Sequence, residues 1–317
     1  MELLGVGTPT MWAGFLSFVV FMLALDLGVF HRKSHAVTMR EALAWSAVWV
    51  ACSFGFAGLV HYWFGWETAV EFVTGYAIEK SLAIDNIFVF VAVFGAFAVP
   101  AALQHRVLFW GVLGALVLRA LFIFAGSAIL LRFHWVLYVF GAFLLLTGLK
   151  MLYLRNAPEE DVTQNRLLTL LRRWIPSTDG YRGDAFFVVE AGRRLATPLF
   201  FVLVLIEVAD VVFAVDSIPA IFAVTTDPFI VFTSNIFAIL GLRSMYFLLA
   251  DIVPRFVYLK PGLALVLVFV GVKMSIAEWY KIPTLVSLGV IGVLVGGAIV
   301  ASLVTFKPAV APSPRQP

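Results

Sequence analysis

Long apolar stretches, separated by short polar connections, run through almost the whole chain. Nine of them come close to the roughly 20 mostly apolar residues that a helix needs to cross a lipid bilayer. The predicted spans are Trp12–Phe30, Ala42–Phe64, Glu71–Val99, Val107–Leu131, Val136–Tyr153, Pro198–Ala223, Pro228–Ala250, Pro261–Tyr280 and Pro283–Phe306. The pattern predicts an all-α polytopic membrane protein with about nine transmembrane helices, folded as a single integral membrane domain over residues 1–317.

The polar connections carry the signals expected at helix ends. Thr38 and Glu41 fit a capping box before the second span. Asp227 followed by Pro228 fits an N-cap with a first-turn proline before the seventh span. The one long connection, residues 154–197, is polar and contains prolines and glycines, which are typical of a loop.

Composition supports the membrane interpretation. The chain is 62% hydrophobic and 13% charged, with a mean hydropathy of +1.01, whereas soluble domains carry about 45–50% apolar and about 25% charged residues. These values exclude a soluble enzyme and a nucleic-acid-binding module, and they make the lipid bilayer the expected partner. The single Cys52 excludes an internal disulfide framework.

Basic residues predict the orientation. If the N-terminus lies outside, the connections on the inner side carry fifteen basic residues and those on the outer side carry only Arg132 and Lys281. The fifteen are Arg32, Lys33, Arg40, Arg106, Arg155, Arg166, Arg172, Arg173, Arg182, Arg193, Arg194, Arg255, Lys260, Lys307 and Arg315. Because cytoplasmic loops carry the excess of Lys and Arg, we expect both the C-terminus and the 154–197 loop to be cytoplasmic. The net charge of +3 is then a signal of topology, with no nucleic acid partner.

Two parts of the chain repeat each other. The matching segments are Glu79–Ile87 with Asp210–Ile218, Leu118-Arg119 with Leu242-Arg243, and Gly148–Met151 with Gly271–Met274. Repeat A (about residues 71–153) and repeat B (about 198–280) each hold three spans, so the second copy runs in the opposite direction across the membrane. Inverted repeats of this kind are typical of secondary transporters, which bind substrate near the midplane. A duplication kept only for packing remains an alternative.

Six acids lie in the interior of the predicted spans, away from the span ends, where a charge costs at least about 2.5 kcal/mol and suggests function. They are Asp26, Glu79, Asp85, Glu207, Asp210 and Asp216. Asn86 and Ser217 follow the second acid of each repeated motif and share a helix face with its first acid. Such oxygen ligands favour hard divalent cations, including Mn²⁺, over copper or zinc. The structural alternative is that Lys80, Arg119 or Arg243 neutralise these acids in buried ion pairs, and for Asp26 both interpretations stay open.

The sequence lacks the motifs of the common enzyme classes. HExxH, GxSxG, a Walker loop and GxGxxG are all missing, so we expect no enzymatic activity and no resident cofactor.

The two acidic motifs resemble the signature segments of the TerC family of bacterial membrane proteins. The second motif continues as Pro219-Ala220-Ile221 and then Ala223 to Asn235 in the same pattern, and the chain length and early Asp26 are most similar to the Alx branch. The resemblance implies metal homeostasis in the bacterial inner membrane, most concretely export of Mn²⁺, and members are also named for tellurium resistance and redox modulation. It implies a cation path through Glu79, Asp85, Asn86, Asp210, Asp216 and Ser217. Glu207 has no acidic counterpart in repeat A.

The resulting hypothesis is a secondary transporter that exports Mn²⁺ past carboxylates at Glu79, Asp85, Glu207, Asp210 and Asp216, with Asp26, Lys80, Arg119 and Arg243 as accessory or charge-balancing residues. Protons are a plausible counter-ion, because buried acids can exchange a metal for protons. The rival hypothesis is a non-transporting membrane scaffold of a stress or tellurium-resistance complex, which would bind an acidic protein through the arginine-rich 154–197 loop.

Overall fold

The computed structural model describes residues 5–30, 38–133, 135–154, 173–190, 192–250, 252 and 256–305, and the side chains of residues 26–30 lie outside this description. In chain order the described helices are α1 (Pro9–Phe30), α2 (Met39–Phe64), α3 (Trp66–Ala96), α4 (Ala101–Arg132), α5 (Val136–Tyr153), α7 (Pro198–Phe222), α8 (Pro228–Leu240), α9 (Leu242–Leu249), α10 (Leu259–Ser275) and α11 (Thr284–Thr305). Strands β1 (Phe187–Glu190) and β2 (Arg193–Ala196) precede α7. The loop residues 155–172 and the side chain of Asp26 lie outside the described part.

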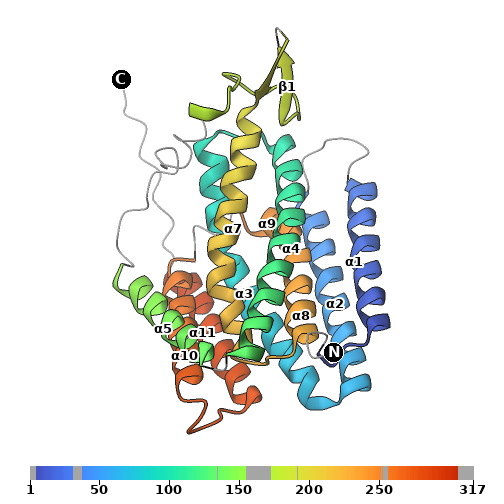
Figure 1. Ribbon diagram of the computed structural model, residues 1–317. Coiled ribbons are helices and arrows are strands. Elements are labelled where there is room, and N and C mark those ends of the chain that lie inside the picture. The colour runs from blue at the N-terminus through green and yellow to red at the C-terminus, as the bar shows by residue number, and fades with distance from the viewer. Residues whose placement is uncertain are drawn as a thin grey trace.

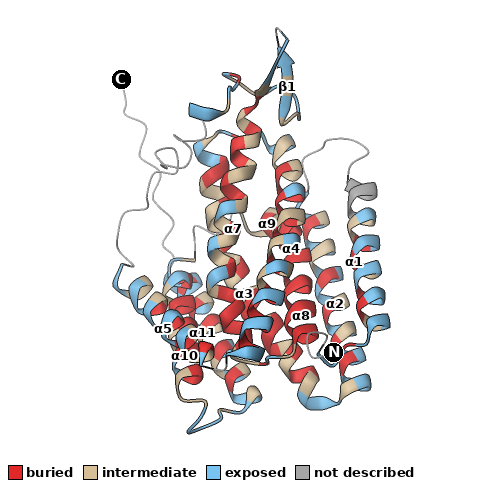
Figure 2. Ribbon diagram, viewed as in Figure 1, coloured by how far each residue is buried: buried red, intermediate tan, exposed pale blue. Residues whose placement is uncertain are grey.

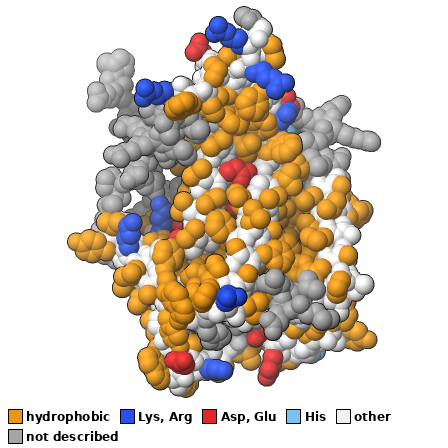
Figure 3. Space-filling view, viewed as in Figure 1, with side chains coloured by type: hydrophobic (Ala, Val, Ile, Leu, Met, Phe, Trp, Pro, Cys, Tyr) orange, Lys and Arg blue, Asp and Glu red, His pale blue; other side chains and the backbone are white. Residues whose placement is uncertain are grey.

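Helices occupy all nine predicted spans, which confirms an all-α polytopic membrane protein. Within the part of the chain that the structure describes, six spans are long and apolar enough to cross a bilayer: α2, α4, α5, α7, α8 with α9, and α11. α1, α10 and the charge-bearing α3 fill the other three predicted ranges. One side of the molecule is largely covered by hydrophobic side chains, with most of the visible charges toward its two ends (Figure 3).

The seventh predicted span is interrupted at Gly241, which separates α8 from α9. Every residue of α8 is buried (Figure 2). Residues Leu242 to Tyr246 of α9 are buried as well, whereas Phe247 to Leu249 are partly exposed. α8 packs against α3, α4 and α2, while α4 also packs against α7. α5, α10 and α11 form a group toward the end opposite the β-hairpin (Figure 1).

α5 and α10 approach each other at backbone distance through a reciprocal contact. A Cβ added to Gly148 of α5 would lie 2.7 Å from the Ala264 carbonyl oxygen, and one added to Gly271 of α10 would lie 2.7 Å from the Gly141 carbonyl oxygen. In the alignment that pairs Gly148 with Gly271, Gly141 pairs with Ala264. The two halves of this crossing therefore make equivalent contacts, as across a two-fold axis.

The predicted helix starts are confirmed. The Thr38 side chain and Glu41 form the capping box of α2. Asp227 Oδ1 accepts hydrogen bonds from the backbone N–H groups of Phe229 (3.0 Å) and Ile230 (3.1 Å) at the start of α8, and its Oδ2 accepts one from Val6 (2.6 Å). Asp227 therefore satisfies three donors from two segments.

Replacing Asp227 with alanine removes this cap, so we expect it to lower the free energy of unfolding by about 1–2 kcal/mol, the usual range for a lost N-cap. Thermal unfolding of the purified protein in detergent would measure the effect. Thr226→Ala, at an exposed neighbouring position, is the matched control. Equal melting temperatures for the two variants would contradict the capping role.

The end of the predicted loop differs from expectation because it folds as a β-hairpin. β1 and β2 pair antiparallel, with Val188 opposite Leu195, and Gly192 adopts the left-handed conformation (φ 74°) that glycine tolerates best. The Phe187 ring packs 4.6 Å from that of Phe200 on α7.

Side chains of the segment just before β1 extend these contacts to the end of α3 and to α4. Tyr181 donates a hydrogen bond to the Phe97 carbonyl oxygen (2.8 Å), and Asp184 pairs with Arg106. The hairpin is thus part of the folded molecule.

Candidate ion-binding site

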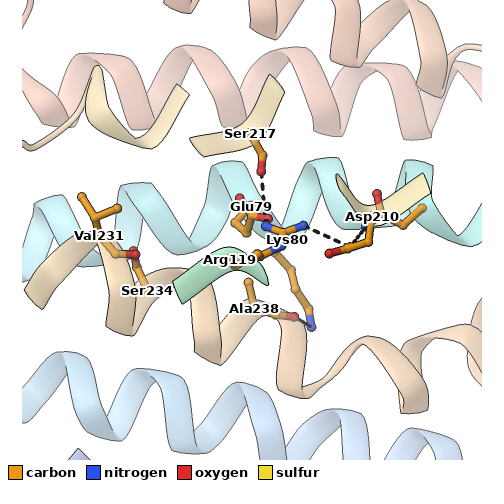
Figure 4. A network of polar contacts seen from close by, with 9 residues as sticks. Glu79, Lys80, Arg119, Asp210, Ser217, Val231, Ser234 and Ala238 are labelled. Atoms are coloured by element: carbon orange, nitrogen blue, oxygen red, sulfur yellow. Dashed lines mark hydrogen bonds and ion pairs between the residues drawn. The ribbon is translucent and has the colours of Figure 1, made fainter. Parts of the chain in front are cut away.

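A buried arginine joins the two repeated acidic motifs. Arg119 of α4 forms an ion pair with Glu79 of α3 through Nη1 and lies 3.5 Å from Asp210 Oδ1 of α7 through Nη2 (Figure 4). The exposed fractions of Arg119, Glu79 and Asp210 are 1%, 1% and 3%. One carboxylate from each motif therefore shares a single guanidinium group deep inside the helix bundle.

The small polar residue of each motif belongs to the same network. Arg119 Nη1 donates a hydrogen bond to Ser217 Oγ (3.2 Å), and Asn86 Nδ2 donates one to Asp210 Oδ1 (3.3 Å). Both residues are buried. Each lies two helical turns after the first acid of its motif, so helical periodicity places acid and polar residue on one face. The structure thus brings together Glu79, Asn86, Asp210 and Ser217, four of the seven predicted ligands.

A cavity of about 390 Å³ reaches this network and also contains the second acid of each motif. Its polar lining consists of Glu79, Asp85, Asn86, Arg119, Thr147, Lys150, Asp216, Ser217 and Lys260. Asp85 and Asp216 are partly buried, and Asp216 faces Thr147 and Lys150 on α5. The cavity lies beside the C-terminal end of α5 and the N-terminal end of α10.

The remaining predicted residues do not line this cavity. The Glu207 carboxylate lies against Gly114 of α4, where an added Cβ would overlap it. Lys80 points to the end of α8, where its Nζ donates a hydrogen bond to the Ala238 carbonyl oxygen (3.3 Å). Arg243 is buried at the start of α9. The Asp26 side chain lies outside the described residues.

A second cavity, of about 500 Å³, lies toward the opposite end of the molecule. Its lining includes Glu71, Thr225, Lys273 and Lys281, and none of the central network residues. A cluster of buried apolar side chains on α3, α5, α7 and α10 contributes to both cavities: Leu267 lines the first and Met274 lines the second. Sequence reasoning missed Glu71 and Thr147. Glu71 was taken as the first residue of a span, and Thr147 carries no charge to attract notice.

The acids are not arranged as a preformed metal site. Among the residues that the structure describes, no group of three or more His, Cys, Asp or Glu side chains is placed to hold a metal ion. The physical reason is visible in the central network, where Arg119 takes the position between Glu79 and Asp210. The buried ion pair that the sequence left as an alternative therefore exists for these two acids.

Comparisons with known proteins agree on one family. The model of the "Integral membrane protein TerC family" matches residues 64–309. The "Putative membrane-bound redox modulator Alx" of Escherichia coli K12 is 52% identical over 95% of this chain and 97% of its own length. A membrane protein of Myxococcus xanthus is 60% identical over 95% and 94% of the two chains, and one of Rickettsia bellii is 41% identical over 92% and 97%. No solved structure matches.

Proposed function

Since the chain belongs to the TerC family of integral membrane proteins, we propose that it is a secondary transporter that exports Mn²⁺ from the cytoplasm. The observation that carries the proposal is the pair of buried carboxylates, Glu79 and Asp210, beside a cavity whose lining adds Asp85, Asp216 and the oxygens of Asn86 and Ser217. These are the hard oxygen ligands that Mn²⁺ prefers. Charged groups inside a membrane protein are costly, so their presence there marks a path or a site by default.

Alternating access of two inverted repeats is the proposed mechanism. The reciprocal contact between Gly148 and Gly271 supports an inverted repeat, because it is the relation expected across a local two-fold axis. Residues of the central network line one cavity, and none of them lines the other. In the orientation predicted from the basic residues, the first cavity faces the cytoplasm, so the conformation described here would take up the ion from the cytoplasm.

The proposal includes a location and a counter-ion. We place the protein in the bacterial inner membrane, with the N-terminus outside and the C-terminus inside, on the distribution of Lys and Arg along the chain. Protons are the proposed counter-ion, because carboxylates that release a metal can take up protons in its place. The chain is proposed to act as a transporter and not as an enzyme, with tellurium resistance and redox modulation as consequences of altered metal balance.

Flux into proteoliposomes tests the function. We expect the purified protein to carry Mn²⁺ across the bilayer, and Asp85→Asn and Asp216→Asn to reduce the rate at least tenfold, because each removes a negative ligand from the cavity. Asp179→Asn, at an exposed position before the hairpin, is the matched control and should leave the rate unchanged. Normal flux in both cavity variants would refute the site. A folded protein with no flux of any divalent ion would support the scaffold hypothesis.

A further inference from the structure

The central carboxylates already hold a cation that belongs to the chain. Arg119 contacts a carboxylate from each motif and the Ser217 hydroxyl, while Asn86 donates a hydrogen bond to the same Asp210 oxygen that Arg119 contacts, Oδ1. All five side chains are at least nine-tenths buried. The network is therefore a cation site whose occupant is a guanidinium group on α4.

A metal ion and this guanidinium cannot occupy the site together. Small hard divalent ions bind carboxylate oxygens at about 2.0–2.6 Å, so an ion shared by Glu79 and Asp210 would stand where Arg119 now contacts both. Two positive groups at that separation repel each other strongly in a medium of low dielectric constant. The lack of a metal-ready group of acids among the described residues agrees with this exclusion.

We propose that Arg119 is a tethered competitor for the transported ion: it occupies the carboxylate pair when no metal is bound and withdraws when the metal enters. The inference rests on the proposed function, since it concerns the same site. Arg119 itself lines the 390 Å³ cavity, which gives the guanidinium space into which to move. The carboxylates are then never left buried without a counter-charge, a state that would be strongly unfavourable.

The choice of arginine has a mechanistic meaning. Arginine remains protonated under all physiological conditions, whereas a buried lysine can lose its proton. A lysine could therefore lose its positive charge without leaving the site, whereas an arginine removes its charge from the site only by moving. Exchange at the central pair is thus an exchange of one cation for another, and the return of Arg119 displaces the metal from the pair.

Mn²⁺ binding to the purified full-length protein, measured by the loss of the free-ion EPR signal, tests the inference. We expect Arg119→Gln to bind Mn²⁺ at least tenfold more tightly than the unmodified protein, because the competitor is gone. Arg119→Lys keeps a positive charge and should bind with intermediate affinity, which provides a second variant in case the glutamine variant folds poorly. Arg132→Gln, an exposed arginine on the same helix, should not change the affinity.

Thermal unfolding with and without Mn²⁺ provides a second measurement. Without the ion, Arg119→Gln should melt at a lower temperature than the unmodified protein. When Mn²⁺ is added, its melting temperature should rise by more than that of the unmodified protein. Folded arginine variants that bind Mn²⁺ no more tightly than the unmodified protein would overturn the inference and leave the proposed function standing. Absence of Mn²⁺ binding in every folded variant and in the unmodified protein would instead overturn the proposed function.

Discussion

Replacing Gly271 with valine should leave little or no folded protein in the membrane. A Cβ at this position would lie 2.6 Å from the backbone nitrogen of Leu145 and 2.7 Å from the carbonyl oxygen of Gly141. Both atoms belong to the backbone of α5, so relief requires the two helices to separate. Overpacking a core typically costs 1–3 kcal/mol, and more where no side chain can yield. Small residues are what allow membrane helices to approach this closely.

Gly292→Val is the matched control, because nothing lies within 4 Å of a Cβ added at that position on α11. The amount of monodisperse protein recovered in detergent, and its melting temperature, would measure both variants. We expect the control to resemble the unmodified protein and Gly148→Val, at the reciprocal position, to fail in the same way as Gly271→Val. Normal yield and stability of Gly271→Val would show that α5 and α10 do not cross as described.

Replacing Glu79 with glutamine should abolish Mn²⁺ flux and lower the free energy of unfolding by about 3–5 kcal/mol, the usual cost of breaking a buried ion pair. The variant keeps the shape of the side chain but leaves Arg119 with Asp210 as its one carboxylate partner among the residues that the structure describes. Unfolding by titration with a denaturing detergent would measure the stability, and proteoliposomes would measure the flux.

A double-mutant cycle identifies the source of this loss. Because Glu79 and Arg119 contact each other, the double variant Glu79→Gln with Arg119→Gln should lose less stability than the sum of the two single variants. Glu207→Gln removes a carboxylate outside the Arg119 contacts and should cost less than Glu79→Gln. Strict additivity in the cycle would show that the pair does not act as a unit.

The helices were predictable because the bilayer imposes a length and a polarity on every span. The capping signals at Thr38 and Asp227 were equally predictable, since each can be recognised from the residues next to it in the sequence. The hairpin at Phe187–Ala196 and the interruption at Gly241 were not predicted. Short strands and single helix breaks depend on packing partners that lie far away in the sequence.

Part of the candidate site was also predictable, because the bilayer constrains where charged residues can lie. The cost of an intramembrane charge drew attention to Glu79 and Asp210, and helical periodicity placed Asn86 and Ser217 beside them. Periodicity also explains why Lys80 lies elsewhere: the residue after Glu79 points about 100° away on the same helix, toward α8. Which cation would stand between the acids depended on how α4 packs, and no local pattern encodes that.

The burial of every residue of α8 also constrains how the protein is assembled. α8 packs against α2, α3 and α4, all of which are synthesised before it. When the ribosome releases this segment, its earlier neighbours have already entered the bilayer, yet they cannot have closed around a helix that did not exist. The final packing of α2, α3 and α4 is therefore reached only after α8 has been made.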